Sequence, residues 1–322
     1  MKRIAPWVLA IGMMVGGGMC SAFAADACTR DDLKAMIGKF FTALEANDPS
    51  KLPLTANARY TENGVETPVG QGLWKTAGKV LVKWDLLDTY KCGTHSTTVM
   101  EEPYTAPKPT GKPDAKENPL FGSRVTPPAE GTPRPILYGV RLKLEGDRIS
   151  EMEAILARET EFAFNAPVVL ENKNQDWESI LPIERRSSRL AMIAAADDYY
   201  DMFSNDPEVH TPFASSCDRW ENGFLTTGGG GTGSGLEATM NAHDCSPKGL
   251  PISNHGPRRF LVDVESGTMV AYLLFAGSLP DFHMFRMRDG KVDLIQSFIG
   301  AGAKDMGWPQ EPIIRGPSKG SY

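Results

Sequence analysis

The sequence has no concentration of charge of one sign. Its 34 lysines and arginines against 40 aspartates and glutamates give a net charge of -6, and no basic cluster stands out. Because nucleic-acid binding depends on concentrated positive charge, we expect no nucleic-acid partner. After the first two dozen residues no run is long and apolar enough to span a bilayer, so we expect no membrane association of the mature chain.

Several catalytic and metal-binding motifs are also missing. There is no C-x-x-C pair, and the five histidines show no ligand spacing, so we predict neither a metal site nor a cofactor. Ser215, Ser216 and Ser234 lack a G-x-S-x-G context, which argues against a serine hydrolase. The glycine run 228–235 lacks G-x-x-x-x-G-K, and we interpret it as a flexible flap rather than a phosphate-binding loop.

What the sequence does contain begins with a targeting segment. Lys2 and Arg3 precede an apolar run over 7–19, and Ala22-Phe23-Ala24 is an A-x-A cleavage site. This order is typical of a secretory signal peptide, so we predict cleavage after Ala24 and a periplasmic or secreted mature chain.

Four of the five cysteines follow the predicted cleavage point. An even number in an exported chain indicates disulfides. Three pairings are possible, and two cysteines fall in each half, which favours Cys28 with Cys92 and Cys217 with Cys245. Free, buried thiols are the alternative.

One order of motifs occurs twice. Each half has an apolar helical pattern that ends in Asn-Asp-Pro, at 47–49 and at 205–207. A short Glu-Asn-Gly segment follows, at 62–64 and at 221–223, and then a glycine-containing loop. A repeat of this length is too long for a solenoid unit and indicates a duplicated small domain. About 300 mature residues also favour two domains over one.

The hydrophobic periodicity predicts where each domain lies. We expect a signal peptide over 1–24, a first domain over 25–165 with a proline-rich insertion at 103–135, and a linker over 166–185. A second domain follows over 186–305, with a tail over 306–322. In the first domain we expect helices over 28–47, 51–57 and 72–81 and extended stretches over 58–63, 84–100, 136–144 and 148–158. In the second, extended stretches cover 260–264, 269–275, 282–287 and 292–299.

The segments Arg-Tyr-Thr-Glu-Asn-Gly at 59–64, Arg-Trp-Glu-Asn-Gly at 219–223 and Phe-Leu-Val-Asp-Val-Glu-Ser-Gly-Thr-Met at 260–269 resemble exported tandem SnoaL-like proteins. The resemblance covers nearly the whole mature chain. It implies an α+β fold of two NTF2-like (SnoaL-like) cones, each with three helices against a curved antiparallel sheet. Enzymes of this superfamily perform acid/base chemistry in an apolar cone without a redox cofactor, and other members only bind ligands.

Five residues are candidates for acid/base chemistry. Tyr60 and Glu62 lie two apart on a predicted strand and therefore share a face, and Glu221 recurs in the second copy. A glutamate that caps a neighbouring turn or pairs with arginine would explain the same pattern. His283 shares a strand face with apolar residues, which suits a buried general base but also a satisfied core histidine. His255 lies in a loop that would border the pocket.

Aromatic and amide side chains are the candidates for substrate binding. They are Trp74, Trp220, Asn63, Asn222, Tyr272 and Phe285. We hypothesise a cofactor-independent lyase or isomerase that acts on a small hydrophobic or aromatic molecule, by dehydration, a double-bond shift or retro-aldol release of formaldehyde. The second cone, with four of the five histidines, is expected to hold the main site. The alternatives are a non-catalytic carrier of a hydrophobic ligand and a structural module. A homodimer is a further expectation.

Overall fold

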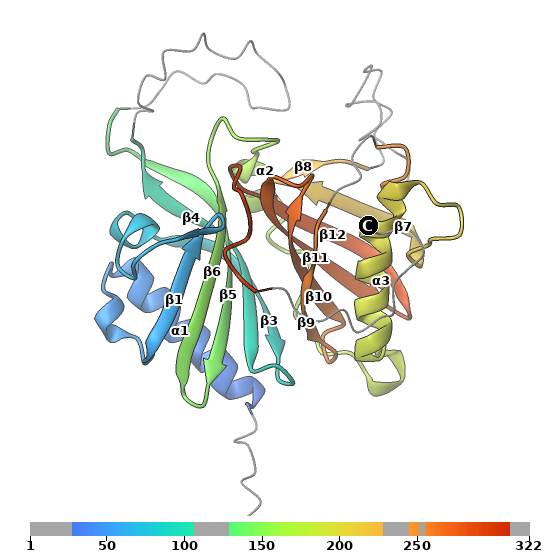
Figure 1. Ribbon diagram of the computed structural model, residues 1–322, viewed down its shortest axis with the longest axis horizontal. Helices are drawn as coiled ribbons and strands as arrows, with labels where there is room; N and C mark the ends of the chain where they lie inside the picture. Colours follow the sequence, from blue (N-terminus) through green and yellow to red (C-terminus); the bar gives the residue numbers. More distant parts are fainter. Residues whose placement is uncertain (1–27, 106–128, 228–244, 251–254, 310–322) are drawn as a thin grey trace, which may run out of the picture.

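The computed structural model describes residues 28–105, 129–227, 245–250 and 255–309. These residues form two six-stranded sheets that lie against each other, and one long helix covers the outer side of each (Figure 1). The predicted signal peptide, the glycine-rich flap and most of the proline-rich insertion lie outside the described residues. No helix in the described part of the chain is long and apolar enough to cross a membrane.

The first half of the chain builds the first sheet, in the strand order β2-β1-β6-β5-β4-β3. Its elements are α1 (Arg30–Glu45), η1 (Pro49–Lys51), β1 (Leu54–Glu62), β2 (Val65–Glu66), η2 (Gly72–Lys75), β3 (Val80–Asp88), β4 (Gly93–Pro103), β5 (Pro133–Glu145) and β6 (Arg148–Ala157).

The second half builds the second sheet in the corresponding order, β8-β7-β12-β11-β10-β9. Two short elements connect the halves, α2 (Ala166–Glu171) and η4 (Ile183–Arg185). The elements that follow are α3 (Arg189–Asp201), η5 (Met202–Ser204), β7 (Phe213–Glu221), β8 (Phe224–Leu225), β9 (Arg259–Asp263), β10 (Thr268–Phe275), β11 (Leu279–Arg288) and β12 (Lys291–Ile299).

Two features of the expected cone need correction. The sheets are mixed rather than antiparallel, because β1 runs parallel to β6 and β7 runs parallel to β12. The described part of each half has one long α-helix instead of three helices.

The helix expected over 72–81 ends as the short η2, because Gly78 donates its N–H to the Glu101 carbonyl and the chain enters β3. The extended stretch over 84–100 is two strands, separated by a turn at which Cys92 has a φ of 48°.

Helix α1 shows how the sequence directs this packing. Thr29 and Asp32 form a capping box that satisfies free amides of the first turn. The apolar positions along the helix repeat at helical spacing, so they form one face that is buried on the first sheet. We call α1 and the side chains of the first sheet that face it the first cone. The second cone is α3 with the side chains of the second sheet that face it.

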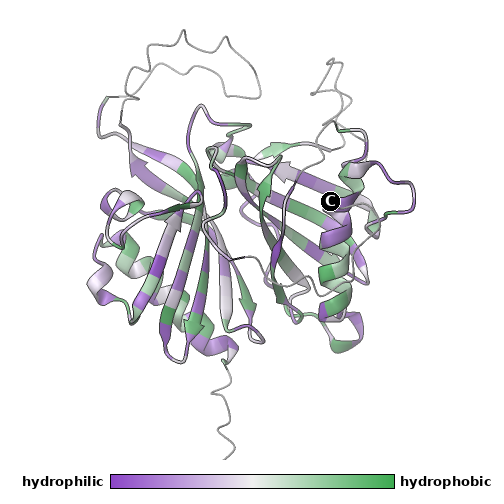
Figure 2. Ribbon diagram, viewed as in Figure 1, coloured by the Kyte–Doolittle hydropathy of each residue, from purple (hydrophilic) through white to green (hydrophobic). Residues whose placement is uncertain are grey.

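A third core joins the two sheets through their other faces, which we call the inner faces. Phe282 of β11 lies against Gly139 of β5 so closely that a Cβ on the glycine would be 1.9 Å from the ring. Apolar residues from both halves contribute to this core (Figure 2). Each inner face is therefore covered by the opposite half of the same chain. The expected homodimer stays a prediction, and it would need a different surface.

The predicted disulfide pairing is confirmed. Cys28 bonds Cys92, with the Cα atoms 5.4 Å apart, and Cys217 bonds Cys245, with the Cα atoms 5.6 Å apart. Both bonds lie within one half of the chain. Cys28 precedes α1 and Cys92 lies in the turn between β3 and β4, whereas Cys217 lies on β7 and Cys245 in a loop.

Candidate functional site

The two Glu-Asn-Gly segments form the same turn. Asn63 and Asn222 have φ angles of 46° and 47°, in the left-handed region that asparagine and glycine tolerate. The Asn63 side chain exchanges two hydrogen bonds of 2.9 Å with the backbone of Leu156. Asn222 does the same with Ile299, at 2.9 and 2.8 Å. Both amides thus extend the sheet, and these bonds account for the two asparagines without a ligand.

Glu62 lies inside the first cone beside the turn that follows. Its Oε1 accepts hydrogen bonds from the Tyr60 hydroxyl and from the Leu73 amide, each at 2.6 Å. Gly72 passes so close that a Cβ there would be 2.3 Å from the carboxylate. The glutamate therefore closes the η2 turn, as the structural alternative for this residue supposed.

Glu221 occupies the equivalent place in the second half. Glu62 is paired with Ala154 on β6, and Glu221 is paired with Ser297 on β12. The Glu221 carboxylate lies 3.3 Å from Nε of the fully buried Arg219. The second glutamate therefore faces a cation, whereas the first faces a phenol and an amide.

The second cone also contains a titratable pair. His283 Nδ1 lies 2.8 Å from Asp281 Oδ2, and both side chains have no exposed surface. Burial raises the pKa of Asp281 well above its usual range and lowers the pKa of His283 to about 3. Both shifts have the same cause, because a low-dielectric surrounding disfavours the charged form of each group. Burial therefore favours the uncharged form of both groups, a carboxylic acid beside a neutral imidazole.

Aromatic rings enclose this pair. The ring centroids of Tyr199 and Tyr200, both on α3, lie 5.5 and 5.4 Å from that of His283. Phe275 and Phe285 lie at 5.9 and 6.0 Å. The Tyr200 hydroxyl is buried with no hydrogen-bond partner among the described residues, and burial raises its pKa well above the usual value. An aromatic enclosure with a few polar groups directed inward is typical of a small-molecule site.

Further buried polar atoms belong to the same cluster. Ser297 is directly opposite His283 across β11 and β12. Within the described part of the chain, its hydroxyl, Oδ1 of Asp281 and Nε2 of His283 have no hydrogen-bond partner. Leaving a buried polar group unpaired costs about 1–3 kcal/mol, so such groups gather where a ligand or water is bound.

His255 packs against aromatic rings of the second cone. Its ring centroid is 4.2 Å from that of Phe203, 4.6 Å from Phe275 and 5.7 Å from Tyr200. Only 2% of its surface is exposed. The neighbouring Arg258 holds this segment to α3 through carboxylates at 2.7 and 2.9 Å, those of Asp197 and Asp201.

The first cone lacks the titratable pair, as the strand register shows. In the second sheet Leu273 is opposite Asp281 and Ala271 is opposite His283. The corresponding pairs of the first sheet are Thr98 with Tyr138 and Ser96 with Val140. A phenol and an aliphatic side chain thus occupy the places of the acid and the imidazole.

The remaining candidates divide between the cones and the inner faces. Trp74 lies in the first cone and Phe285 in the second. Tyr272 and Trp220 pack in the core between the sheets and in neither cone. The Tyr272 hydroxyl lies 2.7 Å from Nδ1 of His95, a histidine of the opposite half.

Sequence reasoning found His283 and missed Asp281. The expected strand began at 282, after Pro280, so the aspartate was placed outside it. In the structure β11 begins at Leu279, which puts Asp281 on the same face as His283 because side chains alternate along a strand. An Asp-x-His pattern at the start of a strand is the signal that could have identified it.

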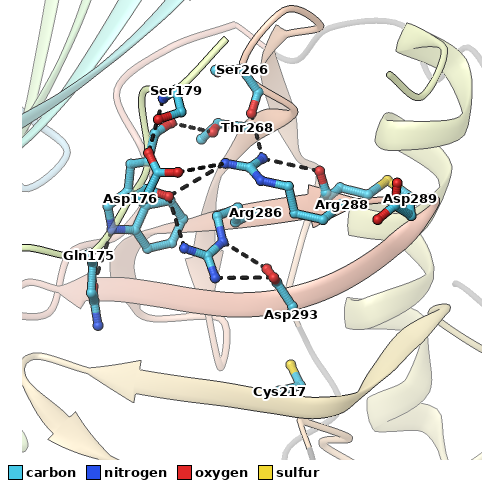
Figure 3. A network of polar contacts seen from close by, with 12 residues as sticks. Gln175, Asp176, Ser179, Cys217, Ser266, Thr268, Arg286, Arg288, Asp289 and Asp293 are labelled. Atoms are coloured by element: carbon cyan, nitrogen blue, oxygen red, sulfur yellow. Dashed lines mark hydrogen bonds and ion pairs between the residues drawn. The ribbon is translucent and has the colours of Figure 1, made fainter. Parts of the chain in front are cut away.

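A separate groove of about 600 Å³ lies outside both cones, between the connecting segment and the β11–β12 hairpin. Its charged side chains pair mainly with one another: Arg286 with Asp293 at 2.8 Å (Figure 3), and Arg185 with Asp289 at 2.7 Å. It shares no residue with the Asp281–His283 cluster. The described residues include no group of three or more histidines, cysteines or carboxylates placed to hold a metal.

The comparisons with known proteins are limited. A family model described as a domain of unknown function, DUF8021, matches residues 185–299, which contain the titratable pair. The comparison with curated proteins found no match.

Solved structures with some likeness include a protein provisionally assigned as a polyketide cyclase in Xanthomonas campestris pv. campestris. It is 10% identical with a TM-score of 0.29, covering 44% of this chain and 96% of that protein. AclR from Streptomyces galilaeus, provisionally assigned as a hydroxylase, is 12% identical with a TM-score of 0.30, covering 45% and 98%. At these TM-scores the likeness assigns neither a fold nor an activity to this chain.

Proposed function

We propose that this protein is a cofactor-independent acid/base enzyme that acts on a small, neutral aromatic molecule inside the second cone. The observation that supports it best is the buried Asp281–His283 pair, at 2.8 Å and with no exposed surface. Burying two titratable groups in an apolar cone costs stability. A functional site is the common reason for retaining such a pair.

The pair can move protons without creating net charge. His283 Nε2 would remove a proton from a carbon next to a carbonyl group, and the Asp281 acid would give its proton to the carbonyl oxygen. The products are an enol, an imidazolium and a carboxylate. Since Nδ1 lies beside the aspartate, the two new charges face each other. A carboxylic acid kept neutral at pH 7 is suited to stabilise a developing oxyanion.

The surroundings select the ligand. Phe275, Phe285 and the two tyrosines of α3 offer ring faces and edges to an aromatic molecule. Arg219, a described cation whose charge acts on His283, is already paired with Glu221. A neutral carbonyl compound therefore suits the site better than a carboxylate, whose charge would have no partner there.

Proton exchange tests the proposal without knowledge of the physiological substrate. Aromatic ketones such as 1-indanone, incubated with the protein in D₂O, should incorporate deuterium next to the carbonyl faster than in buffer, as followed by NMR. His283→Ala should lower this rate on the order of 10²-fold or more. Asp281→Asn should also lower it, because the amide cannot give up a proton in the same way.

The alternative function is a carrier of a hydrophobic ligand, which the aromatic enclosure would also serve. In that case the wild-type protein would bind aromatic ketones without accelerating exchange. Exchange that persists in His283→Ala would also contradict the assigned base. Circular dichroism of each variant checks that the fold is unchanged.

A further inference from the structure

The groove between the connecting segment (176–185) and the β11–β12 hairpin is rich in charged side chains. Four cations and three aspartates line it, and they are Arg185, Arg286, Arg288, Lys291, Asp176, Asp289 and Asp293. Asp293 accepts two hydrogen bonds from Arg286, and Asp289 accepts two from Arg185. The other two cations, Arg288 and Lys291, have no such paired carboxylate among the described residues. The groove therefore has an excess of positive charge at the end of the hairpin.

Arg288 and Lys291 are directly opposite each other across the β11–β12 hairpin. Directly opposite side chains lie on the same face of a sheet, and two like charges in these positions destabilise the strand pairing. The corresponding hairpin of the first half, between β5 and β6, has Glu145 opposite Arg148. The second half thus has a repulsive pair where the first half has an attractive one, and both members of the repulsive pair line the groove.

Backbone groups hold the Arg288 guanidinium beside the groove. Its Nη1 donates to the carbonyl groups of Ser266 and Met287, at 2.5 and 3.2 Å. Gly267 leaves room for this arrangement, because a Cβ there would be 3.0 Å from Nη1. A carboxylate oxygen of Asp176 lies 4.0 Å from Nη2, and the Asp176 side chain is 53% exposed, whereas that of Arg288 is 14% exposed (Figure 3). Arg288 is therefore a largely buried cation with only a weak ion pair.

The positive charge of Arg288 is costly in this position. Burial lowers its pKa, and the charge of the neighbouring Arg286 lowers it further. An anion placed between Arg288 and Lys291 would offset the burial of the guanidinium and the repulsion between the two cations. A carboxylate suits this place, because the planar guanidinium fork matches its two oxygens.

Apolar side chains form another part of the lining. Three of them, Ile180, Leu181 and Pro182, come from the connecting segment, and Ala214 comes from β7. Ile180 is 50% exposed, which is unusual for a large apolar side chain in this protein. The volume of about 600 Å³ lies within the range of small-molecule sites. The groove therefore offers both a charged contact and an apolar one to a single ligand.

We propose that this groove is a second ligand site, which binds an organic acid. Its carboxylate would lie between Arg288 and Lys291, and its apolar body would contact Ile180, Leu181 and Pro182. This inference goes beyond the proposed function, because the groove shares no residue with the Asp281–His283 cluster and takes an anion, whereas the second cone suits a neutral molecule.

Isothermal titration calorimetry tests the site with 4-phenylbutyrate, which has a carboxylate on an apolar body. The acid should bind saturably. The neutral 4-phenylbutyramide should bind about tenfold more weakly or worse, because an amide leaves the charge of Arg288 unpaired. Saturating 1-indanone, the probe of the second cone, should leave the affinity for 4-phenylbutyrate unchanged. Competition between the two would place the acid in the cone and overturn the proposal.

Lys291 provides the decisive variants, because its side chain is exposed. Lys291→Gln should weaken 4-phenylbutyrate binding about tenfold. Lys291→Glu should abolish binding and raise the melting temperature, because it creates an attractive pair like that of Glu145 and Arg148. Arg148→Gln is the matched control in the first half and should leave the affinity unchanged. Ile180→Ala should weaken 4-phenylbutyrate about fivefold and leave the binding of inorganic phosphate unchanged.

Four results would overturn the proposal. The first is the absence of saturable 4-phenylbutyrate binding. The second is an equal loss of affinity in Lys291→Gln and Arg148→Gln, which would indicate a general attraction between charges. The third is equal affinity for inorganic phosphate and 4-phenylbutyrate, which would exclude a role for the apolar wall. The fourth is a lower melting temperature of Lys291→Glu, which would show that the lysine serves stability. None of these results bears on deuterium exchange in the second cone.

Discussion

Asp88 and Asp263 occupy equivalent positions at the ends of β3 and β9, and each binds the arginine that begins the long helix of the opposite half. Asp88 accepts from Arg189 of α3 at 2.8 and 2.6 Å, and Asp263 accepts from Arg30 of α1 at 2.6 Å. The repeat that relates the two halves therefore also relates the two ion pairs. They connect the halves at the edges of the core between the sheets.

The first prediction concerns the Asp88–Arg189 pair. Asp88 has no exposed surface and also accepts from the Val262 amide at 2.9 Å. Replacing it by Asn should lower the free energy of unfolding by about 3–5 kcal/mol, because Arg189 would keep a partly buried, unpaired charge. Urea unfolding measures this loss.

Asp289→Asn is the matched control for Asp88→Asn. Its partner Arg185 is at the same short distance, but both side chains are about half exposed, at 47 and 60%. The loss should be much smaller than that of Asp88→Asn, because solvent screens an exposed ion pair. If both variants lose the same stability, the pair between the halves has no special role.

The second prediction concerns the contact between Gly139 and Phe282. Gly139→Ala should lower stability by about 1–3 kcal/mol, because the added methyl group would overlap the Phe282 ring. Phe282→Leu in the same chain should recover part of the loss. Gly38→Ala in α1 is the control: nothing lies within 4 Å of the added group, so this variant should gain about 0.5–1 kcal/mol. A loss at Gly139 that Phe282→Leu does not relieve would contradict this account.

The third prediction concerns the disulfides. Removing the Cys28–Cys92 bond, which closes 64 residues, should cost more than removing Cys217–Cys245, which closes 28. In the chain-entropy account the difference is about 0.7 kcal/mol within a total of about 2–5 kcal/mol for each bond. Unfolding of the two double-alanine variants measures it. The reverse order would show that native-state strain outweighs chain entropy.

The fourth prediction concerns pH. Asp281 stays protonated in the folded chain because burial raises its pKa, whereas in the unfolded chain it ionises above about pH 4. Above that pH the Asp281 side chain of the folded state holds a proton that the unfolded state has lost, so the contribution of Asp281 to stability falls as pH rises. Asp281→Asn removes this penalty. The free energy of unfolding of Asp281→Asn should exceed that of the wild type by an amount that grows by about 1.4 kcal/mol per pH unit. This growth starts at about pH 4 and ends at the raised pKa of Asp281 in the folded state.

His283 contributes a pH dependence of stability with the opposite sign. Burial lowers its folded pKa to about 3, so the unfolded state binds the extra proton between there and its ordinary value of 6.5. Stability from this group is therefore lost as pH falls through that window. His283→Gln should remove that loss, as thermal unfolding over pH 3–7 would record. An unchanged pH profile in both variants would show that the pair is ionised or hydrated in the folded protein.

The repeat, the disulfides and the candidate His283 could be predicted from local sequence, and the position of Asp281 beside it could not. Glu-Asn-Gly forms the same turn twice because asparagine and glycine accept left-handed backbone wherever they occur. His283 was found because strand alternation is local. Asp281 was missed because the position at which β11 begins depends on pairing with β10 and β12, which a single strand does not reveal.

The sequence by itself determined the duplication, because the two motif copies are local, and it favoured the cysteine pairing, because two cysteines fall in each half. The α+β class was what the family resemblance implied. Only the tertiary structure decided that Tyr272 and Trp220 face the other half while Phe285 faces α3. Strands buried on both faces are apolar throughout, so their pattern does not show which layer covers which face. The burial of Asp281 with His283, and with it the proposed chemistry, follows from that choice of faces.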